Sequence, residues 1–429
     1  MPLEVLIWVV MIGMLMLGAP VFVALGVSSV TVVILSDIPL AMLATDLYKI
    51  ADMFPLLAVV GFVFAGALMD RGGMAEQIVE VASLAVGRVR GGLGIVTILG
   101  CMFFASMIGS GPGTVAAMGS LMIPSMIARG YSPEYAAGVS ATGGTLGILI
   151  PPSNPMLVYG IIANVSISAL FTSGFIPGLI VGSALMLTAY VLARRAGFRG
   201  DMEMPDGKTA RRIILRNIWS LLAPVIILGG IYAGICTPVE ASIVAVWYSL
   251  FVGFVITKRL SRQAVFQAIR MAVVSTGTII IVVGVSNVFG RFLTMYQIPQ
   301  QLAANMLAIT QNPALILIMI MLLLFFLGMF METLATIVVL APIFIPIIKK
   351  VGIDPVYFGI FWVLTNEVAL LTPPLGVNLF IAMNLSGQSL EKVAKGALPY
   401  IIVLSSLTFA SIFFPEIVTF LPKYFGMKW

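Results

Sequence analysis

Two short stretches place prolines beside small polar residues inside otherwise apolar sequence. The first, GILIPPSNPM at residues 147–156, lies in a segment that has no charged residue from Tyr135 to Ala193. The second, ALLTPPLGVN, occupies residues 369–378. A proline inside a helix lacks the backbone N–H and clashes with the carbonyl four residues earlier, so that carbonyl loses its helical partner. Both stretches therefore predict a broken helix with free carbonyl oxygens, which are suitable ligands for a sodium ion.

The free carbonyls are expected four residues before each proline. They are those of Gly147, Ile148 and Pro151 in the first break, and of Ala369 and Leu370 in the second. Thr372 and Asn378 add neutral side-chain oxygens to the second break, and the half-helix ends add partial charge. A proline kink between packed helices is the structural alternative. The recurrence of a Pro-Pro pair among polar residues favours the ion site.

Two further turns, GSGPGT at residues 109–114 and LGMFMETLAT at residues 327–336, lie between apolar pieces and predict the tips of re-entrant hairpins. Their glycines allow close approach of the backbone, and their polar side chains supply oxygens. These residues are Ser106, Ser110, Gly111, Gly113 and Thr114 in the first hairpin, and Gly328, Glu332, Thr333 and Thr336 in the second. Any single Gly or Ser could instead support tight helix packing in lipid. Together, the tips predict two opposite walls of a binding site.

Glu332 and Glu367 are the acids that lie deep within the apolar sequence of the second half. An acid inside a membrane is costly, which favours a role as ion ligand, proton carrier or gate partner. For Glu332 the alternative is a carboxylate that caps a helix end.

The amino-acid composition indicates which kind of secondary structure must position these residues. Of 429 residues, 60% are hydrophobic and 9% are charged, and the mean hydropathy is +1.13. Apolar runs recur along the whole chain without the alternating pattern of a barrel strand, so helices must span the membrane. We therefore expect an all-α polytopic membrane protein.

Several classes of function are excluded. The chain has no histidine, which rules out a Ser-His-Asp hydrolase and argues against an enzyme. The GKT at residues 207–209 is not a P-loop, because Met202 stands where the first glycine is required. Cys101 and Cys236 have no metal-binding spacing. The net charge of +6 comes mainly from basic clusters beside apolar segments, which indicates membrane topology rather than nucleic-acid binding.

The sequence repeats itself at an offset of 222 residues. Five prolines pair without a gap, namely Pro124 with Pro346, Pro133 with Pro355, Pro151 with Pro373, Pro152 with Pro374 and Pro177 with Pro399. The predicted organisation is a first repeat over 1–193, a cytoplasmic linker over 194–213 and a second repeat over 214–429. The expected hairpins cover about 93–128 and 314–349. The expected broken helices cover about 133–164 and 355–386.

Basic residues favour the cytoplasm and set the orientation. Each repeat is expected to contain about five spans and one hairpin, and an odd number of spans inverts the second repeat. Both termini are then expected on the periplasmic side. Lys349 and Lys350 conflict with this arrangement, since they fall on the outer side.

These motifs resemble those of a known family. The stretches GSGPGTVAAMGSLMIPSMIARGYSPEYAAGVSATGGTLGILIPPSNPM and METLATIVVLAPIFIPIIKKVGIDPVYFGIFWVLTNEVALLTPPLGVNLF are similar to the large, DctM-like membrane subunit of tripartite ATP-independent periplasmic (TRAP) transporters. The resemblance covers essentially the whole chain. It implies a sodium-driven importer of organic anions in the bacterial inner membrane, with an elevator-type fold. It also implies two partners, a periplasmic substrate-binding protein and a small four-helix membrane subunit.

The resemblance also implies two or more sodium ions and assigns residues to them. One sodium would be surrounded by Ser106, Gly109, Ser110, Gly144, Gly147 and Ile150. The other would be surrounded by Gly328, Ala369, Thr372 and Leu375. Thr114, Asn154, Thr336 and Asn378 would face the substrate. Gly111 and Thr333 at the tips, and Ser153 at the first break, complete the candidate substrate site, while Glu332 and Glu367 are candidates for ion or proton coupling.

The nature of the substrate stays open at this stage. Neither the breaks nor the tips contain Lys or Arg, so a carboxylate would be held by helix N-termini, hydroxyls and bound sodium. C4-dicarboxylates, keto acids and sugar acids all fit this description. A passive anion channel built from the two hairpins is the alternative function.

Overall fold

The computed structural model describes residues 3–36, 38–86, 89, 91–198, 206–374 and 376–427. Over these residues the fold is entirely helical, with twenty α-helices, one short π-helix and no strand. The all-α prediction is confirmed.

The first half of the chain contains ten helices. They are α1 (Leu3–Met16), α2 (Val21–Leu35), α3 (Ala41–Ala51), α4 (Leu56–Arg71), α5 (Met74–Val86), α6 (Gly92–Ile108), α7 (Gly111–Ala128), α8 (Pro133–Leu149), α9 (Asn154–Ala163) and α10 (Ile167–Arg195). The helix of 133–164 is thus interrupted at residues 150–153, where the prolines lie. Ser110, Ser132, Ser153 and Ser166 cap the helices that follow them, each by accepting a backbone N–H with its side chain. Such caps satisfy donors that a helix start leaves unpaired.

The second half contains the remaining elements. They are α11 (Gly207–Tyr232), α12 (Pro238–Phe251), the π-helix η1 (Val252–Ile256), α13 (Arg262–Met295), α14 (Ile298–Ile309), α15 (Pro313–Gly328), α16 (Thr333–Lys350), α17 (Pro355–Ala369), α18 (Val377–Ser386), α19 (Leu390–Phe413) and α20 (Glu416–Tyr424). The second break lies between Ala369 and Val377, and Leu375 within it is outside the described residues.

The helix ends repeat with the sequence. Helices α7 and α16 begin and end 222 residues apart, and α8 and α17 begin at the same offset. One hydrogen bond repeats as well. The Tyr135 hydroxyl donates to the Ala189 carbonyl at 2.9 Å, and the Tyr357 hydroxyl donates to the Ser411 carbonyl at 2.9 Å. The two halves therefore share a local architecture, whereas the inversion of one half relative to the other stays a prediction.

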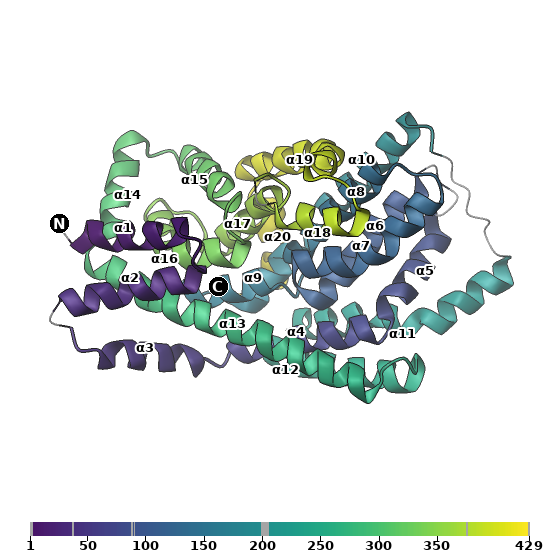
Figure 1. Ribbon diagram of the computed structural model, residues 1–429, viewed down its shortest axis with the longest axis horizontal. Helices are drawn as coiled ribbons and strands as arrows, with labels where there is room; N and C mark the ends of the chain where they lie inside the picture. Colours follow the sequence, from purple (N-terminus) through teal and green to yellow (C-terminus); the bar gives the residue numbers. More distant parts are fainter. Residues whose placement is uncertain are drawn as a thin grey trace.

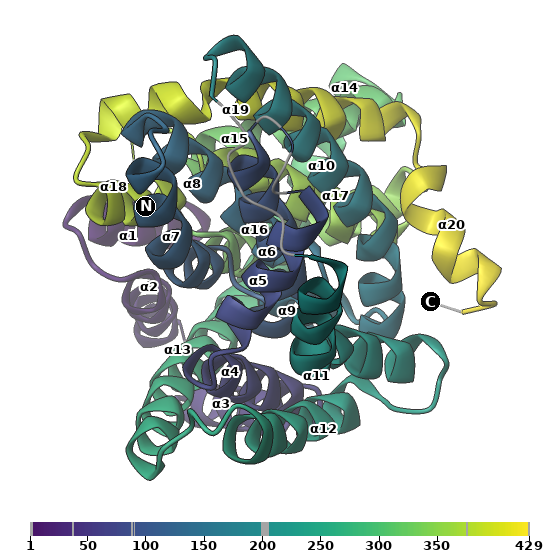
Figure 2. The same cartoon turned by 90° about the vertical axis from the view of Figure 1, so that its right-hand side faces the viewer.

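Seven helices of the described chain are long and apolar enough to cross a membrane, or eight if α3 and α4, bent by 54°, form one span. The longest helix, α13, has 34 residues and would extend about 50 Å at 1.5 Å per residue. It packs against α2, α3, α4 and α16. Helices α3, α4, α12 and α13 form one side of the molecule, in the lower part of Figures 1 and 2. The hairpins and broken helices lie above them.

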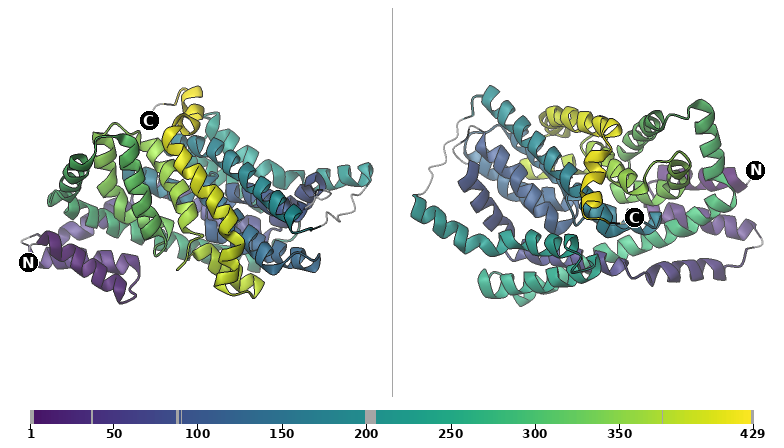
Figure 3. Two further views of the ribbon diagram at one scale, coloured as in Figure 1. Left: turned by 90° about the horizontal axis from the view of Figure 1, so that it is seen from above. Right: turned by 180° about the vertical axis from the view of Figure 1, so that it is seen from behind.

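The broken helices connect the two halves. After the first break, α9 packs against α16 and α17 of the second half. After the second break, α18 packs against α7 and α8 of the first half. Figure 1 shows α18 beside α7 and α8, and α9 beside α17. At the end of the chain, α20 packs on α10, as Figure 3 shows from two sides.

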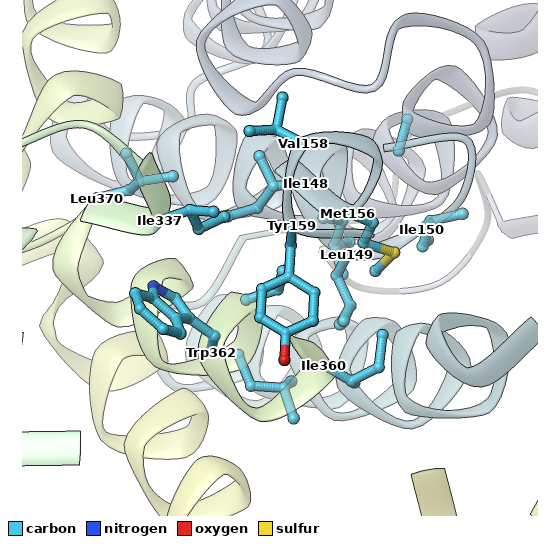
Figure 4. Close-up of a cluster of buried hydrophobic side chains, with 14 of the residues drawn as sticks. Ile148, Leu149, Ile150, Met156, Val158, Tyr159, Ile337, Ile360, Trp362 and Leu370 are labelled. Carbon is cyan, nitrogen blue, oxygen red and sulfur yellow. The ribbon is translucent and has the colours of Figure 1, made fainter. Parts of the chain in front are cut away.

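Apolar side chains beside the first break pack against apolar side chains of the second half (Figure 4). Ile148 lies next to Ile337, and Tyr159 lies next to Trp362, with ring centroids 6.2 Å apart. The Tyr159 hydroxyl donates to the Pro355 carbonyl at 2.7 Å, which satisfies its polar group inside the core. This shared core fixes α9 against α17.

Glycines permit the closest contact between α8 and α19. A Cβ on Gly138 would overlap the backbone carbonyl of Gly396, and a Cβ on Gly396 would overlap the Glu134 carbonyl. We expect Gly138→Ala to force these helices apart and to destabilise the protein by about 1–3 kcal/mol, a typical penalty for overpacking. Thermal unfolding of the purified protein in detergent measures the effect.

The matched control is Gly277→Ala in α13, where an added Cβ would meet nothing within 4 Å. This change should leave the unfolding midpoint unchanged or raise it, because Ala favours helix over Gly. Equal midpoints for the two variants would contradict the close packing of α8 on α19.

Candidate functional site

The first hairpin tip fits against the first helix break. Gly109 ends α6 in the left-handed conformation, with φ of 66°, and its carbonyl accepts from the Asn154 backbone N–H at 3.0 Å. A Cβ at Gly109 would lie 2.5 Å from the Pro152 carbonyl oxygen. Only glycine meets both requirements, since other residues strain in this conformation and would collide here.

Two glycines of α8 bring the same tip close to the helix. A Cβ at Gly147 would lie 2.5 Å from the Ser110 carbonyl oxygen and 2.5 Å from the Thr114 hydroxyl oxygen. A Cβ at Gly144 would overlap Val115 and lie 3.2 Å from the Gly111 carbonyl oxygen. The start of α7 therefore lies directly on the end of α8. Four of the six residues predicted for the first sodium, Gly109, Ser110, Gly144 and Gly147, come together here.

The second tip meets the second break in an equivalent way. Gly328 ends α15, and a Cβ there would lie 2.5 Å from the Ala369 Cβ and 3.1 Å from Asn366 Oδ1. Gly328 and Ala369 follow Ser106 and Gly147 by 222 residues, and Asn366 follows Gly144 by the same offset. Two residues predicted for the second sodium, Gly328 and Ala369, thus lie together.

Thr336 is the centre of a buried hydrogen-bond group in the second half. Its hydroxyl donates to the Thr333 carbonyl at 2.8 Å. The same oxygen accepts from Asn366 Nδ2 at 3.0 Å and from Trp362 Nε1 at 3.4 Å. Helices α16 and α17 are thereby joined beside the tip. Sequence reasoning missed Asn366 and Trp362, although the 222-residue offset places Asn366 opposite Gly144, which it had selected.

Three of the five carbonyls predicted to be free accept other hydrogen bonds. The Ile148 carbonyl accepts from the Ser153 hydroxyl at 2.6 Å. The Ala369 carbonyl accepts from the Thr372 N–H at 3.1 Å, and the Leu370 carbonyl accepts from the Asn378 N–H at 3.3 Å. The chain turns back on itself after each Pro-Pro pair, so nearby donors replace the missing helical ones. A carbonyl with one such bond still has a second lone pair for a cation.

Side-chain oxygens remain without partners instead. Within the described residues, the buried side-chain atoms that have no hydrogen-bond partner include several oxygens around the tips and breaks. They are Asn154 Oδ1, Thr333 Oγ1, Asn366 Oδ1, Asn378 Oδ1 and both carboxylate oxygens of Glu367. Buried polar atoms are normally paired, so this group of unpaired acceptors suits a site that water or a cation completes.

Asn378 links the two halves at this point. Its Nδ2 donates to the Ala141 carbonyl of α8 at 3.2 Å. Its Oδ1 would lie 3.5 Å from a Cβ on Gly111, at the start of α7. The second broken helix therefore presents an oxygen to the first hairpin tip.

The two acids differ in their surroundings. Glu367 is 0% exposed in α17. Glu332 precedes α16 but makes no capping bond with its side chain, so the structure does not support the capping alternative. Glu332 borders three cavities. One of these, between the tips, is lined by Ser110, Asn154, Thr333 and Leu370 among others.

The other two cavities beside Glu332 lie along α13. One, of about 590 Å³, is lined by residues of α4, α7 and the N-terminal part of α13, including Asp70, Ser275 and Thr278. The next, of about 280 Å³, is lined by α2, α16 and the middle of α13. Open volume thus lies between residues 271–283 of α13 and the hairpin tips.

The remaining predicted residues are placed as follows. Ser106 lies one turn before the first tip, and its hydroxyl donates to the Phe103 carbonyl at 2.6 Å. The Ile150 N–H donates to the Leu146 carbonyl at 2.9 Å. The Thr372 hydroxyl donates to the Val368 carbonyl at 2.8 Å. Ser153 is fully buried and its hydroxyl caps α9, while Leu375 lies outside the described residues.

The comparisons with known proteins agree on a family. A family profile described as "Tripartite ATP-independent periplasmic transporter, DctM component" matches residues 8–417. An isethionate TRAP transporter permease protein, DctMQ, from Oleidesulfovibrio alaskensis is 38% identical over 407 residues, which cover 95% of this chain and 64% of that protein. This chain is therefore shorter than that relative.

Two further matches cover nearly the whole of both chains. A C4-dicarboxylate TRAP transporter large permease protein, DctM, from Pseudomonas aeruginosa is 36% identical over 408 residues, 94% of this chain and 95% of that protein. The crystal structure of the Alcanivorax borkumensis YdaH transporter superposes with a TM-score of 0.66 at 15% identity, covering 88% of each chain. The latter match shows the fold alone.

Thr336 provides a test of the site's construction. Thr336→Val removes the oxygen that accepts from Asn366 and Trp362, leaving two buried donors unpaired. We expect a loss of about 1–3 kcal/mol of stability, which is the usual cost of an unpaired buried group. Thermal unfolding in detergent measures it. Thr336→Ser keeps the oxygen and should unfold near the wild-type midpoint, and the same midpoint for both variants would disprove this hydrogen-bond group.

Proposed function

The chain belongs to the DctM family of tripartite ATP-independent periplasmic transporters, and we propose that it forms the membrane pathway of a sodium-coupled importer of small organic anions. Relatives named for isethionate and for C4-dicarboxylates, and others named for sialic acid and for 2,3-diketo-L-gulonate, indicate the substrate class, which is an organic acid such as a C4-dicarboxylate, a keto acid, a sugar acid or a sulfonate. The chain acts as a transporter and carries out no enzymatic reaction.

The observation that carries the proposal is the group of unpaired oxygens at the breaks. Asn154, Asn366, Asn378 and Thr333 offer neutral oxygens, which suit an alkali cation better than a transition metal. No Lys or Arg lines the cavity between the tips, over the residues that the structure describes. Bound sodium would therefore supply the positive charge that holds the anion, and the two solutes would move together.

We assign one sodium position to each of the two contacts between a hairpin tip and a break. The first would use Ser106, Gly109, Ser110, Gly144, Gly147 and Ile150. The second would use Gly328, Ala369, Thr372 and Leu375, and we add Asn366 because its Oδ1 is unpaired beside Gly328. Gly111, Thr114, Ser153, Asn154, Thr333, Thr336 and Asn378 form the proposed substrate site between them. Glu332 and Glu367 remain candidates for ion or proton coupling.

The proposed mechanism is an elevator. The hairpins and broken helices would move as one body, because α9 and α18 cross between the halves and tie them together. Helices α3, α4, α12 and α13 would form the static wall. The cavities along α13 support this division, since a boundary between two bodies that slide cannot be tightly packed along its whole length.

The family supplies the proposed setting. The protein would lie in the bacterial inner membrane with both termini periplasmic. A periplasmic binding protein would deliver the anion, and a small four-helix membrane subunit would complete the complex. The isethionate relative, named DctMQ and longer than this chain, leaves room for that subunit in the same polypeptide.

Transport by the complete complex tests the proposal. In proteoliposomes with the small subunit and the binding protein, we expect uptake of labelled succinate or isethionate only when an inward sodium gradient is present. Replacing sodium with potassium, or omitting the binding protein, should abolish uptake. Uptake that needs neither would instead identify a passive channel.

Thr372 tests the second sodium position. Thr372→Val preserves the shape of the side chain but removes its oxygen, so we expect the sodium concentration for half-maximal uptake to rise about tenfold, equivalent to about 1.4 kcal/mol. Thr372→Ser keeps the oxygen and should behave as the wild type does. An unchanged sodium dependence in the valine variant would remove Thr372 from the site.

A further inference from the structure

A separate cavity near the C-terminal end of α13 contains an arginine. This cavity has a volume of about 320 Å³, near the lower end of the range of about 300–1,000 Å³ for small-molecule sites. It lies between α13, which contributes Asn287 and Arg291, and α16, which contributes Pro342 and Pro346. Arg291 is the one basic side chain that lines any of five cavities found among the described residues.

The Arg291 side chain is fixed but not fully used. Both carboxylate oxygens of Asp46 accept from the same nitrogen, Nη1, at 2.6 Å. Asp46 is 5% exposed in α3, whereas the Arg291 side chain is 47% exposed. A guanidinium has five N–H donors, and its Nε and Nη2 edge matches a carboxylate or a sulfonate. The ion pair therefore orients Arg291 and leaves that edge available.

Asn287 lies one turn before Arg291 on the same face of α13. Its exposed side chain borders the same cavity. An amide donor beside the guanidinium would complete the recognition of an anionic group. The prolines of α16 form the apolar wall opposite, which suits a short carbon chain.

A hydrogen bond joins α13 and α16 between this cavity and the cavities that Glu332 borders. Pro342 has no N–H, so the Val338 carbonyl, four residues earlier, loses its helical partner. That carbonyl accepts instead from the Ser286 hydroxyl of α13. Helices α13 and α16 are joined there, between the Arg291 cavity and the cavities that Glu332 borders.

The charged side chains that line the cavities differ between the two ends of α13. The large cavity beside the N-terminal part of α13 contains Asp70 and Glu332, which repel an anion. Arg262 and Arg270, at the N-terminal end, favour the cytoplasm, so Arg291 lies toward the periplasm. An arriving anion would meet the arginine first.

We propose that the Arg291 cavity is an outer subsite that binds the carboxylate or sulfonate group of the anion before it reaches the hairpin tips. This inference rests on the proposed import of organic anions. Arg291 here is a specificity-determining residue, and its pair with Asp46 holds it in position.

Chemical labelling tests the subsite without requiring transport. Asn287→Cys in a Cys236→Ser background, in the full-length chain purified in detergent, would place a thiol beside Arg291, while the buried Cys101 stays in place. The probes are 2-sulfonatoethyl methanethiosulfonate, an anion, and its trimethylammonium analogue, a cation. We expect Arg291→Gln to lower the ratio of anionic to cationic labelling rates at least about tenfold at fixed ionic strength. An unchanged ratio would overturn the proposal.

Two further variants separate charge from folding. Arg291→Lys keeps the charge and should keep the ratio within about threefold of its original value. The exchanged pair, Asp46→Arg with Arg291→Asp, keeps an ion pair between α3 and α13 but places a negative charge in the cavity. It should favour the cationic probe, and an anionic preference in this variant would show that Arg291 does not set the charge of the cavity.

Protection experiments then identify the chemistry of the occupant. Succinate or isethionate at millimolar concentration should slow labelling of the Asn287→Cys variant at least about threefold when Arg291 is present. In the variant that combines Asn287→Cys with Arg291→Gln, neither anion should slow the labelling. Neutral 1,4-butanediol should give no protection. If a chain that passes the sodium-dependent uptake test shows no protection by either anion, the outer subsite is disproved while the proposed function stands.

Discussion

The fold depends on how a membrane protein satisfies backbone groups at two broken helices. In lipid an unpaired carbonyl or N–H is costly, so irregular backbone persists only where protein covers it. The structure meets this requirement because the helix that follows each break packs against the other half of the chain. Helix α9 leaves the first break to pack on α16 and α17, and α18 leaves the second to pack on α7 and α8. Each break is thus enclosed by a hairpin tip and by a helix of the other half. The glycines at the tips follow from this, because only small residues allow such contacts.

The same requirement changes the chemistry expected at the breaks. Main-chain donors and the Ser153 hydroxyl bond to carbonyls that proline would otherwise leave free. A tight turn brings backbone N–H groups close to backbone carbonyls, so these groups form hydrogen bonds with one another. Side-chain amide oxygens of Asn154, Asn366 and Asn378 have no such neighbours. The proposed ion binding at these breaks would therefore depend on side chains as much as on carbonyls, and it would differ between the halves even though their backbones correspond.

The positions of the two broken helices and of the hairpin tips could be predicted from sequence, because prolines and glycines act locally and recur at one offset. Contacts between distant residues could not. Asn366 is hidden because its equivalent is Gly144, so the motif gives no polar signal. The Arg291 site is hidden for another reason. Its partner Asp46 lies 245 residues away, and a lone arginine within an apolar segment indicates nothing about which cavity it borders. Glu332 was selected from sequence, but its place between three cavities required the structure.

The two halves of the chain differ along α13, and this difference distinguishes the two ends of the molecule. The equivalent segment of the first half is divided at Pro55 into α3 and α4, bent by 54°, whereas α13 runs unbroken with Gly277 at that position. A straight helix of this length borders both hairpins. It carries Arg291 near one end, and acids line the cavity at the other. The cavity between α13 and α16 thus contains a basic side chain, whereas the cavity between α13, α4 and α7 contains Asp70 and Glu332. The proposed subsite at Arg291 would attract an anion, whereas Asp70 and Glu332 in the other cavity would repel it, so the charges that line the cavities beside α13 distinguish the two sides of a repeated fold.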